Sequence, residues 1–262
     1  ATRKCVSRAM HRSATLVQRR SLASLPLTWL PQTKKVGIVG GGPLGEALAF
    51  QCALAGFDTS VMDPSMIALE RMADAHRALS DQFTTDMSQG TPSVPAWGPL
   101  MPKVSWSNQS SWDRLTSKTA ARKIADKALS RLTYSTDAAI AMDNVHLIVE
   151  SLPEDLDLKI SVFTKLHQAA DASTIFTTAA TTLLPSQLAE ASGRPPLFCA
   201  LHFSEDIFTS TVSAVIPHSS TDPLVVAKTR AFADSIHITP LTLGPCFGSA
   251  QGGYAVRKEA DP

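Results

Sequence analysis

The sequence predicts an α/β domain built around a doubly wound, mostly parallel sheet. Between residues 34 and 243, short apolar runs alternate with longer segments in which apolar residues recur at helical spacing. Strands that alternate with helices through short links are typical of a parallel sheet with helices on both faces. A glycine-rich turn also joins the first apolar run to the first helical segment. Together these observations predict a single domain of the Rossmann type.

The glycine-rich turn has the spacing of a dinucleotide-binding motif. The apolar run 35–39 is followed at once by Gly40, and Gly42 and Gly45 come at the start of the helical segment. Gly40 allows the tight turn, Gly42 lets the backbone approach a pyrophosphate, and Gly45 lets the helix pack close to the strand. The phosphates would then face free N–H groups at the N-terminus of the helix. The alternative interpretation is that the glycines serve only the turn and that no nucleotide binds.

An acidic residue stands where the second strand of the motif ends. Asp63 follows the short run 59–62, and its carboxylate would accept hydrogen bonds from the ribose hydroxyls of the adenosine. The same carboxylate would repel a 2′-phosphate, and no arginine occurs at residues 64–66. We therefore expect the cofactor to be NAD(H) rather than NADP(H).

The remaining elements follow in order along the chain. The next expected helix, residues 64–79, places Met66, Leu69 and Met72 on its buried face and His76 on the surface. The apolar face expected for a later helix includes Leu158. We expect further helices at 118–132, 155–170, 185–192 and 222–235, and further strands at 146–150, 174–178, 197–203, 211–216 and 236–243.

Charge is distributed unevenly along the chain. The sequence has 24 basic and 23 acidic side chains, and eight of the basic ones and no acid precede Glu46. The rest therefore carries 24 − 8 = 16 basic against 23 acidic side chains, a net charge of −7, which argues against a body that binds nucleic acid. No apolar run reaches the roughly 18–20 residues of a membrane span. Cys52 and Cys199 lie in apolar patterns and are expected to be buried thiols, and we expect no structural metal.

Three segments do not fit this plan of strands and helices. Residues 1–33 are rich in arginine and serine and contain no acid, as is typical of a mitochondrial transit peptide; a disordered basic arm and a nucleic-acid-binding tail are the alternatives. Residues 83–117 are rich in proline and hold three of the four tryptophans, namely Trp97, Trp106 and Trp112. This composition predicts an insertion that contacts a partner or folds back over its own domain. Residues 244–262 form a glycine-rich tail.

Further motifs give the domain a family resemblance. They are Ser135–Ala138, Val149–Lys159, Thr174–Phe176, Ser186–Glu190, Gly193–Pro195 and Leu201–Phe203. Together with the glycine turn and Asp63, they make residues 34–243 resemble the N-terminal NAD-binding domain of the L-3-hydroxyacyl-CoA dehydrogenases. The resemblance implies hydride transfer from a 3-hydroxyl carbon to NAD, with His202 as general base and Thr181 in place of a substrate-binding serine. It also implies that Glu154 and Lys159 contact the nicotinamide half of the cofactor.

The chain departs from the family at its catalytic positions. Where the family has a glutamate that orients the catalytic histidine, this chain has Ala214. The family's Asn-Thr-Ser-Ser run becomes Ala-Ala-Thr-Thr at 179–182, and its His-Phe-Phe-Asn-Pro becomes His-Phe-Ser-Glu-Asp at 202–206. The chain ends at Pro262, before the helical domain that completes the substrate pocket in the family. In a comparable dyad, loss of the orienting carboxylate costs about 10⁴ in rate.

Two functional hypotheses of different classes result. The first is a pseudoenzyme that serves as an accessory subunit of a mitochondrial complex on the matrix side, with or without bound NAD(H). Its host would be a respiratory-chain complex, the ATP synthase or the mitoribosome, and it would contact other subunits through residues 1–33 and 83–117. The second is an active NAD-dependent 3-hydroxyacyl-CoA dehydrogenase of fatty acid oxidation with His202 as the base. A sensor that binds NAD(H) without chemistry is a third alternative.

Overall fold

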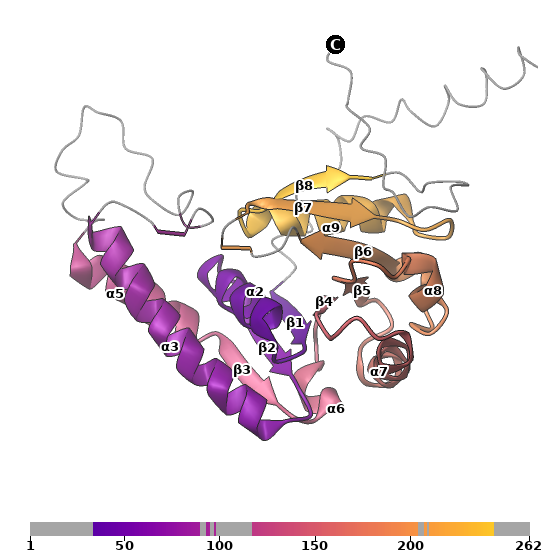
Figure 1. Cartoon of the computed structure of the whole chain (residues 1–262), viewed down its shortest axis with the longest axis horizontal. Helices are drawn as coiled ribbons and strands as arrows, with labels where there is room; N and C mark the ends of the chain where they lie inside the picture. The colour runs from indigo at the N-terminus through magenta and orange to yellow at the C-terminus, as the bar shows by residue number, and fades with distance from the viewer. Residues whose placement is uncertain are drawn as a thin grey trace, which may run out of the picture.

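A sheet of eight described strands organises the molecule (Figure 1). The computed structural model describes residues 34–89, 93–94, 97, 117–203, 207–208 and 210–243. The strands lie in the order β3-β2-β1-β4-β5-β6-β7-β8. Their bounds are β1 Lys35–Val39, β2 Asp58–Met62, β3 Leu132–Ser135, β4 Leu147–Glu150, β5 Ile175–Thr178, β6 Phe198–Phe203, β7 Val212–Ile216 and β8 Thr239–Thr242.

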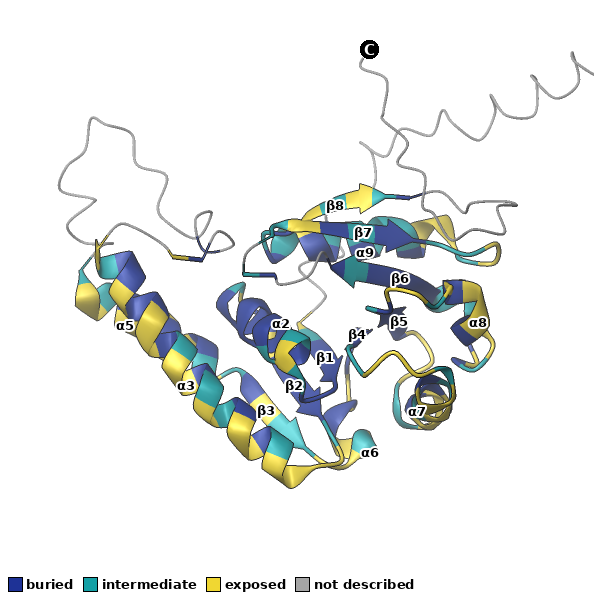
Figure 2. Ribbon diagram, viewed as in Figure 1, coloured by how far each residue is buried: buried dark blue, intermediate teal, exposed yellow. Residues whose placement is uncertain are grey.

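The described α-helices cover both faces of this sheet (Figure 2), and each face has its own hydrophobic core. One core is formed with α2, α3, α5 and α9, and the other with α6, α7 and α8. The helix bounds are α2 Pro43–Leu54, α3 Met66–Gln89, α5 Lys118–Leu129, α6 Ala138–Ala141, α7 Leu156–Ala169, α8 Pro185–Ala189 and α9 Pro223–Ser235. A short 3₁₀ turn, η4 (Pro195–Leu197), precedes β6.

The strand pairing confirms the doubly wound, mostly parallel sheet that the sequence predicts. Neighbouring strands pair in parallel except β6 and β7, which are antiparallel. From β1 the chain proceeds to one side through β2 and β3, then returns to β4 on the other side of β1. Ligands of such sheets bind at the carboxyl ends of the strands where the order reverses. The fold therefore places a binding site above the ends of β1 and β4.

Helix α3 is longer than the sequence analysis predicts. It continues to Gln89 rather than ending near residue 79, so the first part of the predicted insertion 83–117 is helical. Phe83 and Met87 explain the extension, because both are buried on the face that packs against the core. Near the end of the helix, Asp86 accepts hydrogen bonds from the N–H and the hydroxyl of Ser93, which lies beyond it.

Trp97 belongs to the core of its own domain. Its side chain is fully buried and packs edge-on against the rings of Phe50, Phe83 and Phe208. Of the two alternatives for this segment, the burial of Trp97 supports one that folds back over its own domain at this residue. Trp106, Trp112, the basic segment 1–33 and the tail 244–262 lie outside the described residues.

His76 is buried, which corrects its predicted position on the surface. Its Nε2 lies 2.9 Å from the Glu46 carbonyl oxygen and its Nδ1 2.6 Å from the Tyr134 hydroxyl. A carbonyl only accepts, so Nε2 donates to it, and Nδ1 accepts from the tyrosine. Burial lowers the pKa of His76 to about 4, although the bond to the Glu46 carbonyl opposes this shift. A neutral histidine thus joins α3 to the first turn of α2.

Smaller differences concern individual side chains and boundaries. Met66 and Leu158, both predicted to face the core, are 57% and 40% exposed. Helix α5 ends at Leu129 instead of residue 132, because Leu132 begins β3 and pairs with Thr59 of β2. Cys52 and Cys199 are buried free thiols, as predicted.

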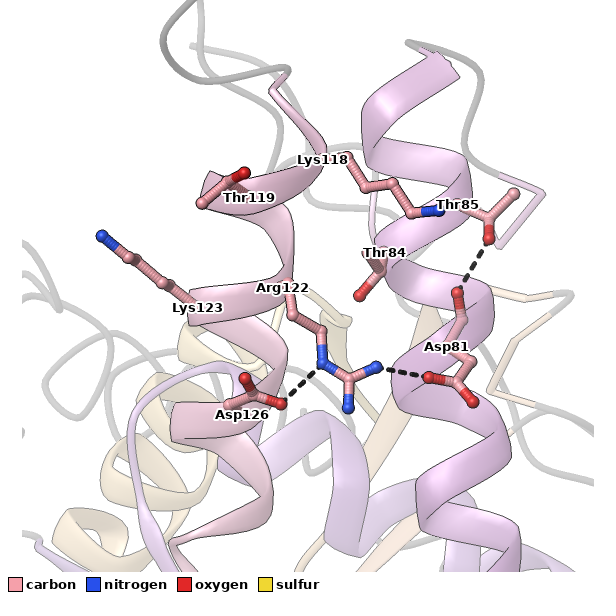
Figure 3. Close-up of a pocket in the computed structure, with 8 residues that line it drawn as sticks. All are labelled: Asp81, Thr84, Thr85, Lys118, Thr119, Arg122, Lys123 and Asp126. Carbon is pink, nitrogen blue, oxygen red and sulfur yellow. Dashed lines mark hydrogen bonds and ion pairs between the residues drawn. The ribbon is translucent and has the colours of Figure 1, made fainter.

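A polar pocket of about 660 Å³ opens between α3 and α5 (Figure 3). In it Arg122 bridges Asp81 of α3 and Asp126 of its own helix. All three side chains are largely exposed, so these ion pairs contribute little to stability. Among the described helices, none is long and apolar enough to cross a membrane.

The last strand of the described sheet, β8, pairs with β7 through alternate residues. The N–H groups of Thr239 and Leu243 donate to the carbonyl oxygens of Thr211 and Val215. Because N–H groups alternate in direction along a strand, that of a residue at position 240 would point away from β7. The residue there is Pro240.

Candidate functional site

Three of the glycines in the turn after β1 have three different physical roles. Gly40 has φ +115°, and its N–H donates to the Met62 carbonyl oxygen at 2.9 Å, which closes the turn onto β2. A Cβ on Gly45 would lie 2.1 Å from the Gly40 carbonyl oxygen, so only glycine allows the helix to pack this closely. A Cβ on Gly42 would meet nothing within 4 Å. The space beside Gly42 is therefore open to a ligand.

Helix α2 presents its N-terminus at this turn. Gly42 is the N-cap residue, and no side chain caps the helix. The first intrahelical bond runs from the Glu46 N–H to the Gly42 carbonyl. The N–H groups of Leu44 and Gly45 precede that bond and have no intrahelical acceptor, whereas Pro43 has no N–H to offer. Two backbone donors and the helix dipole thus favour an anion here.

Asp63 lies at the end of β2 and is tied to the glycine turn. One carboxylate oxygen accepts from the Gly41 N–H at 2.7 Å and the other from the Ser65 N–H at 2.8 Å. Each oxygen has a second lone pair with which to accept a ribose hydroxyl. Open space at Gly42, free N–H groups and a fixed carboxylate are the features that the two phosphates and the adenosine ribose of NAD require. The residues present therefore fit this cofactor.

A buried ion pair fixes the loop after β4. Lys159 is 1% exposed, and its Nζ lies 2.6 Å from a carboxylate oxygen of Glu150, which is fully buried. The ammonium group also donates to the Leu152 carbonyl at 2.9 Å, while Glu150 accepts from the hydroxyl of Thr178 at 2.6 Å. The Lys159 side chain is thus buried and bonded within the domain. There it fixes the loop that follows β4, beside the point where the strand order reverses. Sequence analysis assigned no role to Glu150, although a carboxylate at the end of a buried strand is a usable signal.

Glu154 anchors the turn after β5. One of its oxygens accepts from the N–H groups of Thr181, Thr182 and Leu183 at 2.9, 2.7 and 3.1 Å. Partial burial opposes ionisation, but the hydrogen bonds from Thr182 and Leu183 outweigh it and hold the pKa of Glu154 below its usual value. The structure thus brings Glu154 and Thr181 together at the same edge, joined through the Thr181 backbone rather than its exposed side chain.

His202 lies near the end of β6, on the same sheet as the glycine turn but on the far side of β4 and β5. In the antiparallel pair with β7, its direct partner is Ala214. The Nδ1 atom of His202 is buried and has no hydrogen-bond partner among the described residues. The side chain that faces the imidazole across the strands is a methyl group. Residues 204–206, which follow His202, lie outside the described part of the chain.

Arg71 is a second residue that sequence reasoning missed at this site. It comes from α3, and one of its terminal nitrogens donates to the Gly41 carbonyl oxygen at 2.5 Å. Arg71 lies eight positions after Asp63, outside residues 64–66 that directly follow the acid, and α3 brings it back to the glycine turn. Arg71 also lies close enough to Glu46 to oppose the rise that burial causes in the pKa of that carboxyl.

The fold and the site define an NAD-binding domain of the dehydrogenase type. The family model of the 3-hydroxyacyl-CoA dehydrogenase NAD-binding domain matches residues 100–246, more than half of the 262-residue chain. The chain belongs to this family. The matched residues do not include the glycine turn, which the β1–β4 pairing places beside them.

The chain is also similar to individual proteins and solved structures. The fatty acid oxidation complex subunit alpha of Shewanella amazonensis is 30% identical over 123 residues, which cover 47% of this chain and 17% of that protein. A solved diketoreductase, described for its dual catalysis of dicarbonyl compounds, is 32% identical with a TM-score of 0.64; the match covers 80% of this chain and 64% of that one. The 3-hydroxybutyryl-CoA dehydrogenase of Escherichia coli K12 shares the fold at 20% identity and a TM-score of 0.64, covering 81% and 38%. The chain thus spans less than two thirds of the length of these relatives.

Proposed function

We propose that this chain is a catalytically inactive, NAD-binding relative of the 3-hydroxyacyl-CoA dehydrogenases that serves as an accessory subunit of a mitochondrial complex. The observation that carries the proposal is the pairing of His202 with Ala214, which leaves the buried Nδ1 of the imidazole without a partner in the described residues. The domain keeps its nucleotide cradle, and its described residues place beside His202 no group that would make it an effective base.

The chemistry explains why this pairing matters. When bound, NAD accepts the hydride from the carbon that carries the hydroxyl. The protein must take the hydroxyl proton, and a histidine does so through one nitrogen while the other is held by a carboxylate. The carboxylate fixes the tautomer and stabilises the imidazolium, and its loss costs about 10⁴ in rate in the comparable serine-protease dyad. With Ala214 opposite, the described residues give His202 neither effect.

The acyl side of the site supports the same conclusion. At 179–182 the backbone N–H groups of Thr181 and Thr182 are engaged by Glu154. Ala179 and Ala180 offer no side-chain polar atoms to a thioester or a 3-hydroxyl. Thr181 is left with a single exposed hydroxyl for substrate contact. A weak base is therefore combined with a poor acyl site.

The accessory role and the mitochondrial location rest on the sequence. Residues 1–33 carry basic side chains without any acid, and the 83–117 segment is rich in proline and holds Trp106 and Trp112. The proposed partners are other subunits of a matrix-side assembly, which these two segments would contact. In this role NAD(H) would stabilise the fold, by about 2.7 kcal/mol at a concentration of 100 Kd.

The test of inactivity measures NADH oxidation with acetoacetyl-CoA by the full chain and by His202→Ala. We expect both proteins to stay below about 1 s⁻¹, the lower end of usual enzyme turnover. NADH binding, followed by its fluorescence, is measured on the same samples and should be retained by both. Turnover above that limit that disappears in His202→Ala would instead establish the active 3-hydroxyacyl-CoA dehydrogenase.

The test of the accessory role is the size of the native protein. Mitochondria are solubilised gently and separated by native electrophoresis, and the chain is located with an antibody. We expect it to migrate with a large complex. Migration as a free monomer, or a signal confined to another compartment, would overturn this part of the proposal.

A further inference from the structure

One residue of the glycine turn is held at both ends of its backbone. The N–H of Gly41 donates to Asp63 at 2.7 Å, and the carbonyl of Gly41 accepts from Arg71 at 2.5 Å. A Cβ at Gly41 would lie 3.1 Å from the same Asp63 oxygen and 3.1 Å from the Ala68 side chain. The turn therefore packs tightly against the start of α3, and a carboxylate and a guanidinium flank it where the adenosine ribose would lie.

The Asp63 carboxylate carries a negative charge that backbone groups already share. Both of its oxygens accept N–H donors, from Gly41 and Ser65. Hydrogen bonds to an ionised carboxylate spread its charge over the donors. Its repulsion of a second anion is therefore weaker than that of a carboxylate without such donors.

Arg71 has unused capacity to bind an anion. The side chain is exposed, and in the described part of the chain it forms one hydrogen bond, to the Gly41 carbonyl, and no ion pair. A guanidinium has five N–H donors in a planar fork that matches a phosphate. Ser65 is also exposed, and its hydroxyl oxygen accepts the Ala68 N–H at 3.2 Å, which leaves the hydroxyl proton free to donate.

We propose that Arg71 is a cofactor-selectivity residue whose guanidinium offsets the repulsion between Asp63 and a 2′-phosphate, so that the glycine turn accepts NADP(H) as well as NAD(H). In dinucleotide sites an acid beside the ribose selects NAD, and an arginine nearby accommodates the 2′-phosphate. This chain has both, one on each side of Gly41. The inference rests on the binding of a nicotinamide dinucleotide at this turn.

The test compares the affinities of NADH and NADPH by fluorescence titration and by melting temperature, with no substrate present. The variants of the full chain are Arg71→Gln, Asp63→Ser and the double variant. Glutamine can still donate to the Gly41 carbonyl, so Arg71→Gln removes the charge while it preserves the turn. The matched control is Arg77→Ala, which removes an exposed arginine of the same helix that pairs with Asp74.

We expect wild-type protein to bind NADPH within about tenfold of NADH, a difference of about 1.4 kcal/mol. Arg71→Gln should weaken NADPH binding about tenfold and NADH binding by less than about threefold, because only the former has the phosphate that a guanidinium binds. Asp63→Ser should reverse the preference, so that NADPH binds more tightly than NADH. The double variant should bind the two nucleotides equally well. Arg77→Ala should change neither affinity.

Three results would overturn the inference. Equal weakening of both nucleotides by Arg71→Gln would show that the arginine acts only through the turn. NADH binding without measurable NADPH binding, in wild type and in Asp63→Ser, would show that Arg71 does not reach the phosphate. Failure of wild-type protein to bind either nucleotide would refute the cofactor itself, and so is distinguishable from the other two.

Discussion

Two regions along the carboxyl edge of the sheet differ in how their polar groups are paired. Above β1, β2 and β4, Asp63 is held by two backbone donors, and the buried Lys159 and Glu150 hold each other. At β6 and β7, His202 faces Ala214, and its buried Nδ1 is unpaired among the described residues. Buried polar groups are normally satisfied, so an unpaired one indicates a lost partner or a function outside the domain. Among the described residues, the polar groups of the first region are paired, whereas the buried Nδ1 of His202 in the second is not.

The largest expected effect comes from a substitution in the region above β1, β2 and β4. Lys159→Met leaves the fully buried Glu150 without its partner, and removal of one member of a buried pair costs about 3–5 kcal/mol. Urea unfolding followed by circular dichroism measures the loss. Lys165→Met, an exposed lysine on the same helix, is the control and should stay within about 0.5 kcal/mol of wild type. A similar small change for Lys159→Met would show that the pair does not hold the loop.

The pH dependence of stability tests the His76 contact behind the glycine turn. The pKa of about 4 in the folded state is below the ordinary 6.5, so between these values the unfolded chain binds the proton more strongly. Stability is therefore highest above about pH 6.5 and falls by about 2 kcal/mol on going from pH 7 to pH 5. Urea unfolding at the two pH values measures this difference. His76→Gln should remove most of it, and an unchanged slope in that variant would assign the titration to other groups.

Two glycine substitutions separate folding from binding in the cradle. Gly42→Ala adds a methyl group that meets no protein atom within 4 Å, so its stability should remain within about 1 kcal/mol, the size of an N-cap effect. NADH affinity should fall at least about tenfold, because the methyl group occupies the approach of the pyrophosphate. Gly45→Ala should instead destabilise the fold by about 1–3 kcal/mol through overpacking against the Gly40 carbonyl. Full NADH affinity in Gly42→Ala would mean that the nucleotide does not use this turn.

The smallest expected effect comes from a substitution at β6 and β7 that gives His202 a carboxylate partner. Ala214→Glu places a carboxyl group on the residue that directly opposes His202. General-base catalysis contributes about 10²–10⁴ in rate, so even partial recovery should raise acetoacetyl-CoA reduction at least about tenfold over background. Val212→Glu introduces the same group two residues earlier on the same face of β7 and should have no such effect. A gain that persists when His202→Ala is added would exclude the repaired dyad as its source.

The fold was predictable because its signals are local. Residues 34–63 contain a strand, a glycine turn, a helix and an acid, and the conformation of each depends on residues close in sequence. The structure places them as expected. Sequence analysis failed where long-range packing decides. The polar stretch after residue 79 is helical because Phe83 and Met87 reach the core, and Trp97 is buried by three rings distant in sequence.

The candidate site was predictable only in part, for the same reason. Its positions follow from motifs, but the contacts of each side chain do not. Arg71 reaches Gly41 because a helix turns it back toward β1, and Lys159 is committed to Glu150 because both are enclosed by the fold. The arrangement of Ala214 opposite His202 depends on the register of an antiparallel strand pair, which spacing alone does not determine.

The proline in β8 has a consequence for how the protein behaves in concentrated solution. The outer side of an edge strand can pair with a strand from another molecule. Each backbone N–H that is missing there weakens this pairing. Pro240 supplies no hydrogen where one would point outward. The pairing of further strands with this edge of the described sheet is thereby disfavoured.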